Sequence, residues 1–166
     1  MEALSKKEVE IISKLEFDQT YFFTRKQITP FFQNSQHLSD FIFGLKKKKR
    51  IIKINRSKYY LIPIKAKSGG WSEDPFIIAD EICNSKNYFI GGFAAANYWK
   101  FTDQIPQQID LYATQRQGKT KIMNTRFVFH RTTKKQTQNS ILRHISGHPF
   151  SIIKKERAKK WIHQKP

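Results

Sequence analysis

Residues 34–63 read NSQHLSDFIFGLKKKKRIIKINRSKYYLIP, and this stretch decides the fold that we expect for the N-terminal part of the chain. Asn34 and Ser35 offer turn and cap chemistry at the start of a helix. The apolar residues that follow recur at helical spacing, and they are Leu38, Phe41, Ile42 and Leu45. The runs 50–54 and 59–63 are rich in β-branched and aromatic residues, and four polar residues separate them. The stretch therefore predicts a helix followed by a β-hairpin.

Two capping boxes predict two further helices before this stretch. Ser5 and Glu8 are three residues apart, and Thr24 and Gln27 repeat this spacing. The first helix therefore begins at Ser5, and the second is short, about 24–31, because Pro30 disfavours helix at the preceding residue. A short helix, a tight turn, a second helix, a basic loop and a hairpin follow one another in a winged helix-turn-helix. We expect such a domain over residues 1–65.

The helix that begins near residue 35 is the predicted recognition helix. In a winged helix-turn-helix the second helix of the pair enters the major groove, and its N-terminal residues reach the base edges. Gln36 is the best candidate to contact adenine, because its amide donates and accepts a hydrogen bond together. The full set expected at base edges is Ser35, Gln36, His37, Ser39 and Asp40.

A block of cations surrounds the predicted hairpin. Residues 46–58 hold eight basic residues and no acid, whereas a solvated helix end would account for one or two lysines. If half of these side chains each neutralise one phosphate, the logarithm of the DNA affinity falls with the logarithm of salt with a slope of about −3.6. The residues predicted to contact phosphate are Thr24, Arg25, Lys26, Lys46, Lys47, Lys48, Lys49, Arg50, Lys53, Asn55, Arg56, Ser57 and Lys58.

The charge of the whole chain favours a nucleic acid as the partner. The 166 residues include 31 Lys and Arg against 13 Asp and Glu, a net charge of +18, and residues 115–166 alone carry +13. An anionic membrane is disfavoured, because strand-like sequence follows the lysine run 46–50 where a membrane-surface helix would need an apolar face. We expect double-stranded DNA and no membrane. A second DNA surface is predicted at Arg126, Arg131, Lys134 and Lys135.

The compartment is predicted to be the cytoplasm. The residues after Met1 lack the charged and apolar segments of a secretion signal, and no stretch approaches 18 uninterrupted apolar residues. The single cysteine, Cys83, excludes an internal disulfide and fits a reducing environment.

Residues 66–166 are expected to form a small mixed α/β domain with a β-sheet, so the fold class is α+β. Residues 65–72 look like a hinge, and Asp74 with Pro75 opens a helix. A strand is expected at 88–90, a helix at 93–99, and further strands at 109–113, 125–130 and 150–153. The basic run 154–160 is equally well explained as a solvated tail or as a nucleic-acid contact.

The carboxylates of this second domain give a weak indication of an enzyme. Asp110 on a strand, with Lys121 beyond it, faintly resembles the centre of a metal-dependent nuclease, but no second acid follows at the required spacing. Asp80 and Glu81 are read as the solvent-facing side of a helix, and Asp74 as a cap. We therefore predict no catalytic residue and a protein that is not an enzyme.

Metal and cofactor sites are also disfavoured by the sequence. His144 and His148 are four apart, but Gly147 and Pro149 predict a turn there, and no acid or cysteine stands nearby to complete a zinc site. Cys83 reads as a small buried residue. Gly91 and Gly92 follow a strand and indicate a tight turn, because they lack a dinucleotide or phosphate-loop pattern. We expect no metal and no cofactor.

The order of motifs resembles a known family. A winged helix-turn-helix pattern is followed by Gly70-Trp71, Asp74-Pro75 and Ile78-Ala79, then by the runs 88–95 and 102–106, and then by 109–114. Over roughly residues 5–130 this layout is similar to the AbiEi family of antitoxins and predicted regulators of viral defence systems, and the part from Tyr88 to Thr114 is the most specific.

This resemblance implies an antitoxin of an abortive-infection toxin–antitoxin pair. Such a protein represses its own operon through inverted repeats, as a homodimer would, and counters a nucleotidyltransferase toxin. The N-terminal domain would repress, and the second domain would act on the toxin. Two alternatives stay open from the residues: a metal-dependent nuclease that uses Asp110, and an antitoxin that binds a protein toxin or RNA through its basic surface.

Overall fold

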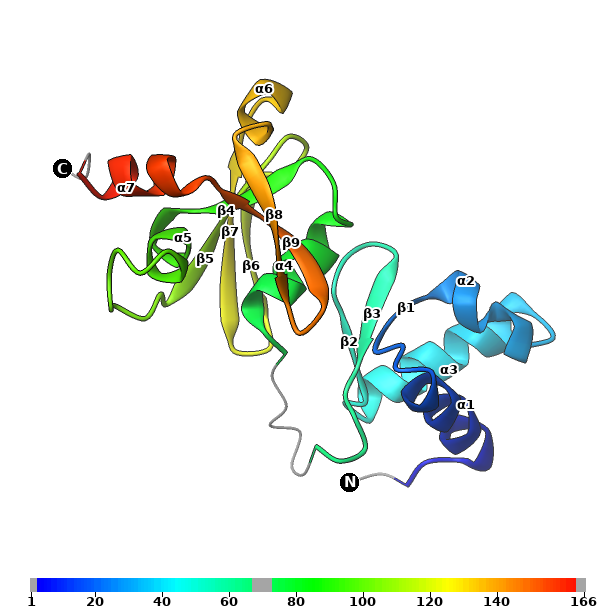
Figure 1. Ribbon diagram of the computed structural model, residues 1–166. Helices are drawn as coiled ribbons and strands as arrows, with labels where there is room; N and C mark the ends of the chain where they lie inside the picture. The colour runs from blue at the N-terminus through cyan, green and yellow to red at the C-terminus, as the bar shows by residue number, and fades with distance from the viewer. Residues whose placement is uncertain (1–2, 67–72, 164–166) are drawn as a thin grey trace. The chain divides into compact units, whose positions relative to one another are not determined.

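The chain folds as two compact units, residues 1–72 and 73–166, whereas the sequence suggested a boundary after residue 65. The computed structural model describes residues 3–66 and 73–163 (Figure 1). Most of the predicted hinge at 65–72 lies outside the described residues, and so does the whole pair Gly70-Trp71. Each unit combines helices with one β-sheet in its described part, so the class is α+β. None of the described helices combines the length and the apolar character that a membrane crossing requires.

The N-terminal unit alternates short helices with a small sheet. Its elements are α1 (Lys6–Phe17), β1 (Phe22–Thr24), α2 (Arg25–Ile28), a 3₁₀ turn η1 (Thr29–Phe31), α3 (Ser35–Lys47), β2 (Ile51–Lys53) and β3 (Lys58–Leu61). β3 lies between β1 and β2 and is antiparallel to both. The three expected helical segments and the hairpin are present. The sequence did not predict β1, because a run of three residues carries too little pattern.

Caps fix the ends of these helices. Ser5 and Glu8 form the predicted capping box of α1, since the Ser5 amide donates to Glu8 Oε2 at 2.6 Å and the Ser5 hydroxyl accepts from the Glu8 amide at 3.3 Å. Asn34 caps α3 by accepting from the amide of His37 at 2.9 Å. α3 ends where Lys49 adopts a left-handed conformation with φ of 55°. That turn lets the amide of Arg50 donate to the carbonyl of Leu45 at 2.8 Å.

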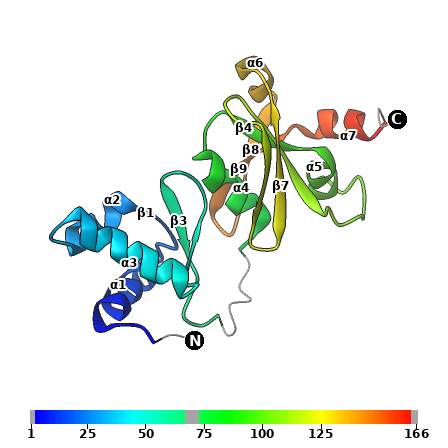
Figure 2. The same cartoon turned by 180° about the vertical axis from the view of Figure 1, so that it is seen from behind.

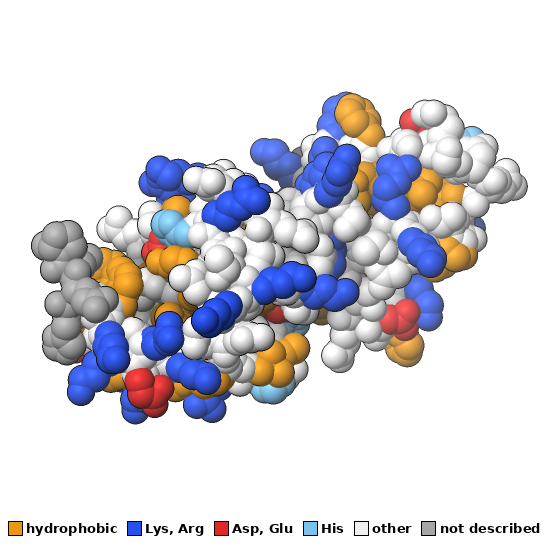
Figure 3. All heavy atoms as spheres, turned by 90° about the horizontal axis from the view of Figure 1, so that it is seen from above, with side chains coloured by type: hydrophobic (Ala, Val, Ile, Leu, Met, Phe, Trp, Pro, Cys, Tyr) orange, Lys and Arg blue, Asp and Glu red, His pale blue; other side chains and the backbone are white. Residues whose placement is uncertain are grey.

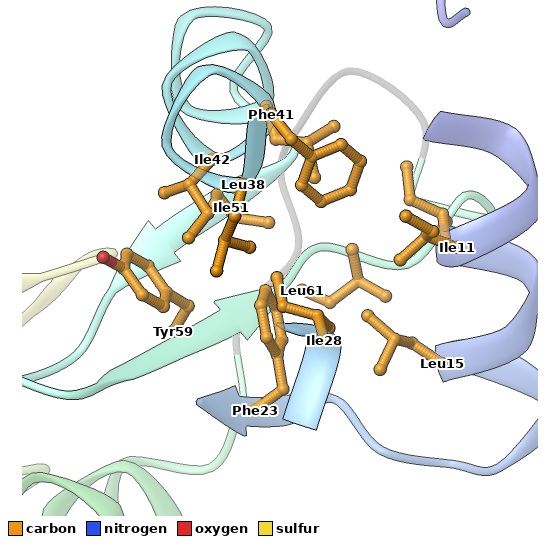
Figure 4. Packing of buried hydrophobic residues seen from close by; sticks show 12 residues of the cluster. Ile11, Leu15, Phe23, Ile28, Leu38, Phe41, Ile42, Ile51, Tyr59 and Leu61 are labelled. Atoms are coloured by element: carbon orange, nitrogen blue, oxygen red, sulfur yellow. The ribbon is translucent and has the colours of Figure 1, made fainter. Parts of the chain in front are cut away.

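The core of this unit is the meeting point of α1, α3 and the sheet (Figure 4). Leu38 and Phe41 point from α3 toward Ile11 and Leu15 of α1, and Leu61 lies on the sheet beneath them. Burying each such side chain contributes roughly 1.5–3 kcal/mol to folding. The helix that carries the predicted recognition residues is therefore held along its inner face by the apolar core of its unit.

The second unit is built on a six-stranded mixed sheet. Its strands are β4 (Tyr88–Gly91), β5 (Gln108–Ala113), β6 (Gly118–Ile122), β7 (Thr125–Arg131), β8 (Ser140–Ile145) and β9 (His148–Ile153). They are ordered β6-β7-β5-β4-β9-β8, with β5–β7 and β4–β9 parallel and the other pairs antiparallel. The helices are α4 (Pro75–Cys83), α5 (Gly92–Tyr98), α6 (Lys134–Thr137) and α7 (Lys155–His163).

Helices cover both faces of this sheet. α4 contacts β5 and β9, and the Tyr88 hydroxyl on that face donates to Asp80 of α4 at 2.7 Å. α5 and α7 lie together on the other side, where the rings of Phe93 and Trp161 are 5.1 Å apart. Figure 2 shows α4 on one side of β7 and both α5 and α7 on the other, as Figure 1 does from the front. Residues that alternate along β4 therefore meet different helices.

One expectation for this unit was wrong, and two strands were not predicted. Asp80 was read as solvent-facing, but it is 2% exposed, because α4 turns it toward the sheet. Residues 155–160 of the basic run form the start of α7, whose Ala158 is buried, so this part of the run is a packed helix and not a tail; a nucleic-acid contact through its exposed lysines stays a prediction. The edge strands β6 and β8 were not predicted, because their residues are mostly exposed or half-buried and carry little strand pattern. The cap of α4 is as predicted, with Asp74 accepting from the amide of Phe76 at 2.8 Å.

Candidate nucleic-acid interface

The outer face of α3 is polar and exposed along most of its length. Leu38, Phe41, Ile42 and Leu45 face the core, so the residues between them point outward. Ser35, Gln36, His37 and Asp40 are exposed near the start of the helix, and Ser39 is half-buried. Further along the same outer face the Phe43 side chain is 69% exposed. The predicted base-contacting residues therefore share one face of one helix.

Gln36 is oriented by its neighbour one helical turn away. Its amide Nε2 donates to Asp40 Oδ1 at 2.9 Å. A primary amide has two N–H groups and a carbonyl oxygen, so this bond leaves one donor and the acceptor for an adenine edge. Asp40 thus holds the amide of Gln36, and its negative charge would repel a nearby phosphate.

Ser39 joins α3 to α2. Arg25 Nη2 donates to Ser39 Oγ at 2.9 Å, and that hydroxyl donates to the carbonyl of Ser35 at 2.8 Å. The hydroxyl hydrogen of Ser39 is therefore already used, and the residue that was expected at a base edge serves to hold the corner between the two helices. Arg25 is exposed and keeps further N–H groups for a phosphate.

The turn of the β2–β3 hairpin is built by Asn55. Its Oδ1 accepts from the amides of Ser57 and Lys58, each at 3.0 Å, and from the Ser57 hydroxyl at 3.3 Å. This side chain shapes the turn, which is a usual role of asparagine in such loops. Lys53 and Arg56 are exposed on the same hairpin. The structure thus separates one residue that shapes the hairpin turn from two whose charge faces solvent.

Two of the predicted phosphate contacts have structural roles. Lys48 Nζ lies 2.6 Å from Glu8 Oε2, and the two side chains are 16% and 9% exposed. Arg50 Nη2 donates to the carbonyl of Ile62 at 3.0 Å. Burial alone would raise the pKa of Glu8, but the hydrogen bonds from Lys48 and Ser5 outweigh it and lower the pKa below its ordinary value. The Lys48 ammonium is therefore held against Glu8 inside the protein, which leaves it less available to a phosphate than its exposed neighbours.

The other predicted cations of this unit are distributed around α2, the end of α3 and the hairpin. Lys46 and Lys49 are exposed, and so is Lys26. Lys47 is exposed and Lys58 is half-buried, and both also make further interactions within the protein. Thr24 is the N-cap residue of α2, and its amide donates to Gln27 Oε1 at 2.7 Å. Figure 3 shows Lys and Arg side chains over the viewed face of each unit, with few Asp and Glu side chains among them.

The cations proposed as a second DNA surface do not form one patch. Arg126 and Arg131 lie near opposite ends of β7, roughly 16 Å apart at the usual rise of a strand, and on opposite faces of the sheet. Lys134 and Lys135 follow Arg131 in α6 and are exposed. Arg131, Lys134 and Lys135 therefore form a group at one end of the sheet, and Arg126 stands apart from it.

The residues considered for catalysis are held in ordinary structural contacts. Asp110 is 9% exposed, and its Oδ1 lies 3.0 Å from Gln108 Nε2 and 2.9 Å from His130 Nε2. Gly92 has φ of +59°, and a Cβ there would lie 2.7 Å from Asp110 Oδ2, so backbone geometry requires this glycine. Burial raises the pKa of Cys83 to about 12, so its thiol stays protonated at neutral pH.

Comparisons with known proteins inform the fold. No family model matches the chain, and a search of curated proteins finds no match. Among solved structures, the fold is similar to that of the RV2827C protein from Mycobacterium tuberculosis, with a TM-score of 0.57 and 14% sequence identity. The match covers 86% of this chain and 51% of the other, so this chain spans about half the length of that protein. At this identity the likeness concerns the fold alone.

Proposed function

We propose that this protein is a sequence-specific DNA-binding regulator whose N-terminal unit is a winged helix-turn-helix. The observation that carries the proposal is α3, a 13-residue helix with one face in the core and a polar outer face that begins at its N-terminus. α2 precedes it across a short turn, and the β2–β3 hairpin follows it with exposed cations. This order is the one in which such domains present a recognition helix and a wing.

In this proposal the two sets of residues have different tasks. Gln36 reads a base edge, with Asp40 holding its amide, and the exposed cations Lys53 and Arg56 contact phosphate. The affinity then contains a salt-dependent part from the cations and a sequence-dependent part from α3.

The biological role we propose is autoregulation within a toxin–antitoxin or viral defence locus, in the cytoplasm. The support for this role is the motif order between Tyr88 and Thr114 that resembles AbiEi proteins. A nucleotidyltransferase toxin is the partner that this role would entail, and the second unit is where we would look for its contact.

The test is binding to the DNA upstream of the protein's own gene, measured by fluorescence anisotropy at several salt concentrations with random DNA as competitor. A specific regulator should prefer the cognate fragment by about a thousandfold or more. The Gln36→Ala variant should lose about 1–3 kcal/mol of cognate binding and little of random binding. Gln107→Ala, which removes an exposed glutamine from the second unit, serves as the control.

The contribution of the exposed hairpin cations to DNA binding is tested with Lys53→Ala and Arg56→Ala. Each should weaken cognate and random binding alike and reduce the salt slope by about 0.9. Equal affinity of the wild type for cognate and random DNA, or a Gln36→Ala variant that binds as the wild type does, would contradict a sequence-reading role for α3.

A further inference from the structure

Three side chains that could ligate a metal converge in the second unit. Asp80 and Glu81 lie on α4, and His148 is the first residue of β9. His148 Nε2 is 3.3 Å from Asp80 Oδ2 and 3.7 Å from Glu81 Oε1, and one ligand atom of each residue lies within 4.8 Å of the others. The sequence had disfavoured zinc at His148 for want of a nearby acid. The acids are present, but they precede it by 68 and 67 positions, and only the fold brings them to it.

The spacing of the three groups also suits ligands around a cation. His148 Nε2 is within hydrogen-bonding distance of Asp80 Oδ2, and both of its separations from the carboxylates are longer than the roughly 2.7–2.9 Å of a short charge-assisted bond. Zinc binds nitrogen and oxygen at about 2.0–2.2 Å, so two ligand atoms of a tetrahedral zinc lie about 3.4 Å apart. A divalent ion between them could accept a lone pair from each of the three groups at once.

The surroundings hold the carboxylate of Asp80 in place. The Tyr88 hydroxyl donates to Asp80 Oδ1 at 2.7 Å, and the Ser85 hydroxyl donates to Asp80 Oδ2 at 2.6 Å. The amide of Ser151 in turn donates to the Tyr88 hydroxyl at 3.1 Å. Hydrogen bonds of this kind orient metal ligands in proteins and fix their geometry. The Asp80 carboxylate is thus fixed by α4, β4 and β9 together.

The cluster is open on one side. The side chain of Asp80 is 3% exposed, whereas those of Glu81 and His148 are 14% and 24% exposed. An ion could therefore enter from solvent, and three protein ligands would leave a coordination position for water.

We propose that Asp80, Glu81 and His148 bind a divalent first-row metal ion, with Zn²⁺ as the expected occupant. One imidazole nitrogen and two carboxylate oxygens suit Zn²⁺ better than Mg²⁺ or Ca²⁺, which prefer oxygen alone. The bound ion would tie α4 to the start of β9 and so fasten the β8–β9 hairpin at the edge of the sheet. This proposal is independent of DNA binding by the other unit.

The test is titration of the untagged, chelator-stripped full chain with ZnCl₂ in a calorimeter. We expect one ion per chain, and no saturable binding of MgCl₂ under the same conditions. His148→Gln and Glu81→Gln should each lower the Zn²⁺ affinity at least tenfold, and Ser85→Ala should lower it about 10- to 100-fold by freeing the Asp80 carboxylate. His144→Gln is the matched control, because His144 is exposed on β8 of the same hairpin.

Folding of each variant is checked by circular dichroism, and a second measurement does not depend on the strength of the calorimetric signal. Zn²⁺ that binds only the native state raises the Tm. The wild type and His144→Gln should show this rise, and His148→Gln should not. Because Glu81→Gln changes a partly exposed residue by one atom, it keeps the test valid if His148→Gln fails to fold. Absence of one-to-one binding, or binding that His148→Gln and Glu81→Gln leave unchanged, would overturn the proposal.

Discussion

The two units carry the same net charge but pair their buried carboxylates with different partners. Residues 1–72 hold 15 basic and 6 acidic residues, and residues 73–166 hold 16 and 7, so each unit has a net charge of +9. In the N-terminal unit the buried acid, Glu8, faces the ammonium of Lys48. In the second unit, Asp80 and Asp110 each face a histidine instead.

This difference in partner changes what the buried acid can do. An ammonium group only donates hydrogen bonds, so the Glu8–Lys48 pair can hold α1 against the end of α3 and nothing else. An imidazole can donate, accept or bind a metal, so the histidine pairs of the second unit are chemically versatile. Net charge does not distinguish the two units, but the residue that pairs with each buried carboxylate does.

The largest effect is expected from breaking the lysine pair. Lys48→Met would leave the carboxylate of Glu8 buried without its counter-charge, so the N-terminal unit should lose about 3 kcal/mol of stability. The measurement is urea unfolding, with hydrogen exchange in α1 and α3 to assign the loss to this unit. The exposed Lys46→Met should change stability by less than about 0.5 kcal/mol. If the two variants unfold alike, the ion pair contributes nothing to stability.

The next largest loss of stability is expected at Gly92, where the Asp110 side chain lies close to the backbone. Gly92→Ala should cost about 2 kcal/mol, because the new Cβ would meet Asp110 Oδ2 at 2.7 Å and the residue has φ of +59°. Gly147 also has a positive φ, +81°, but a Cβ there would meet nothing within 4 Å. Gly147→Ala should therefore cost only about 1 kcal/mol. Thermal unfolding of both variants measures the difference. Equal losses of stability would show that the Asp110 side chain moves away from the new Cβ at no cost.

Removal of His130 should have a smaller effect than removal of Lys48. The His130 side chain is 42% exposed, so solvent screens its interaction with Asp110, and Gln108 remains as a donor to the same carboxylate oxygen. We expect His130→Ala to cost no more than about 1 kcal/mol in chemical unfolding. A loss as large as that of Lys48→Met would mean that both units depend on their buried pairs equally.

The elements that could be predicted from the sequence are those whose signal is local. α3 and the hairpin follow from periodicity between Leu38 and Leu61, and α1 and α4 follow from their caps at Ser5 and Asp74. β1 could not be found this way, because its strand character comes from pairing with β3, where Phe23 lies opposite Tyr59. The edge strands β6 and β8 likewise depend on pairing with β7 and β9 for their conformation.

The chemistry of individual side chains was harder to predict than the elements that carry them. Lys48 stands out in the sequence as part of a basic run, but nothing nearby indicates its partner Glu8, 40 residues earlier. The sequence places Asp80 on a helix but does not indicate the side of that helix which meets Tyr88 and His148. Both errors arise because burial of a charged group is decided by tertiary contacts, which local periodicity does not report.

The smallest effect is expected from acid, and its sign follows from Glu8. Because the native state lowers the pKa of Glu8 below its ordinary value of 4.5, the folded unit binds fewer protons at this site than the unfolded chain. The resulting stability is fully present above 4.5 and is lost as the pH falls through the lowered pKa. The N-terminal unit of the wild type should therefore weaken below pH 4.5, measured by urea unfolding at a series of pH values. Glu8→Gln should flatten this dependence, whereas the exposed Glu10→Gln on the same helix should keep it. If the stability of Glu8→Gln falls with pH as steeply as that of the wild type, the acid sensitivity belongs to other carboxylates. The Glu8–Lys48 pair would then not be what makes the N-terminal unit sensitive to acid.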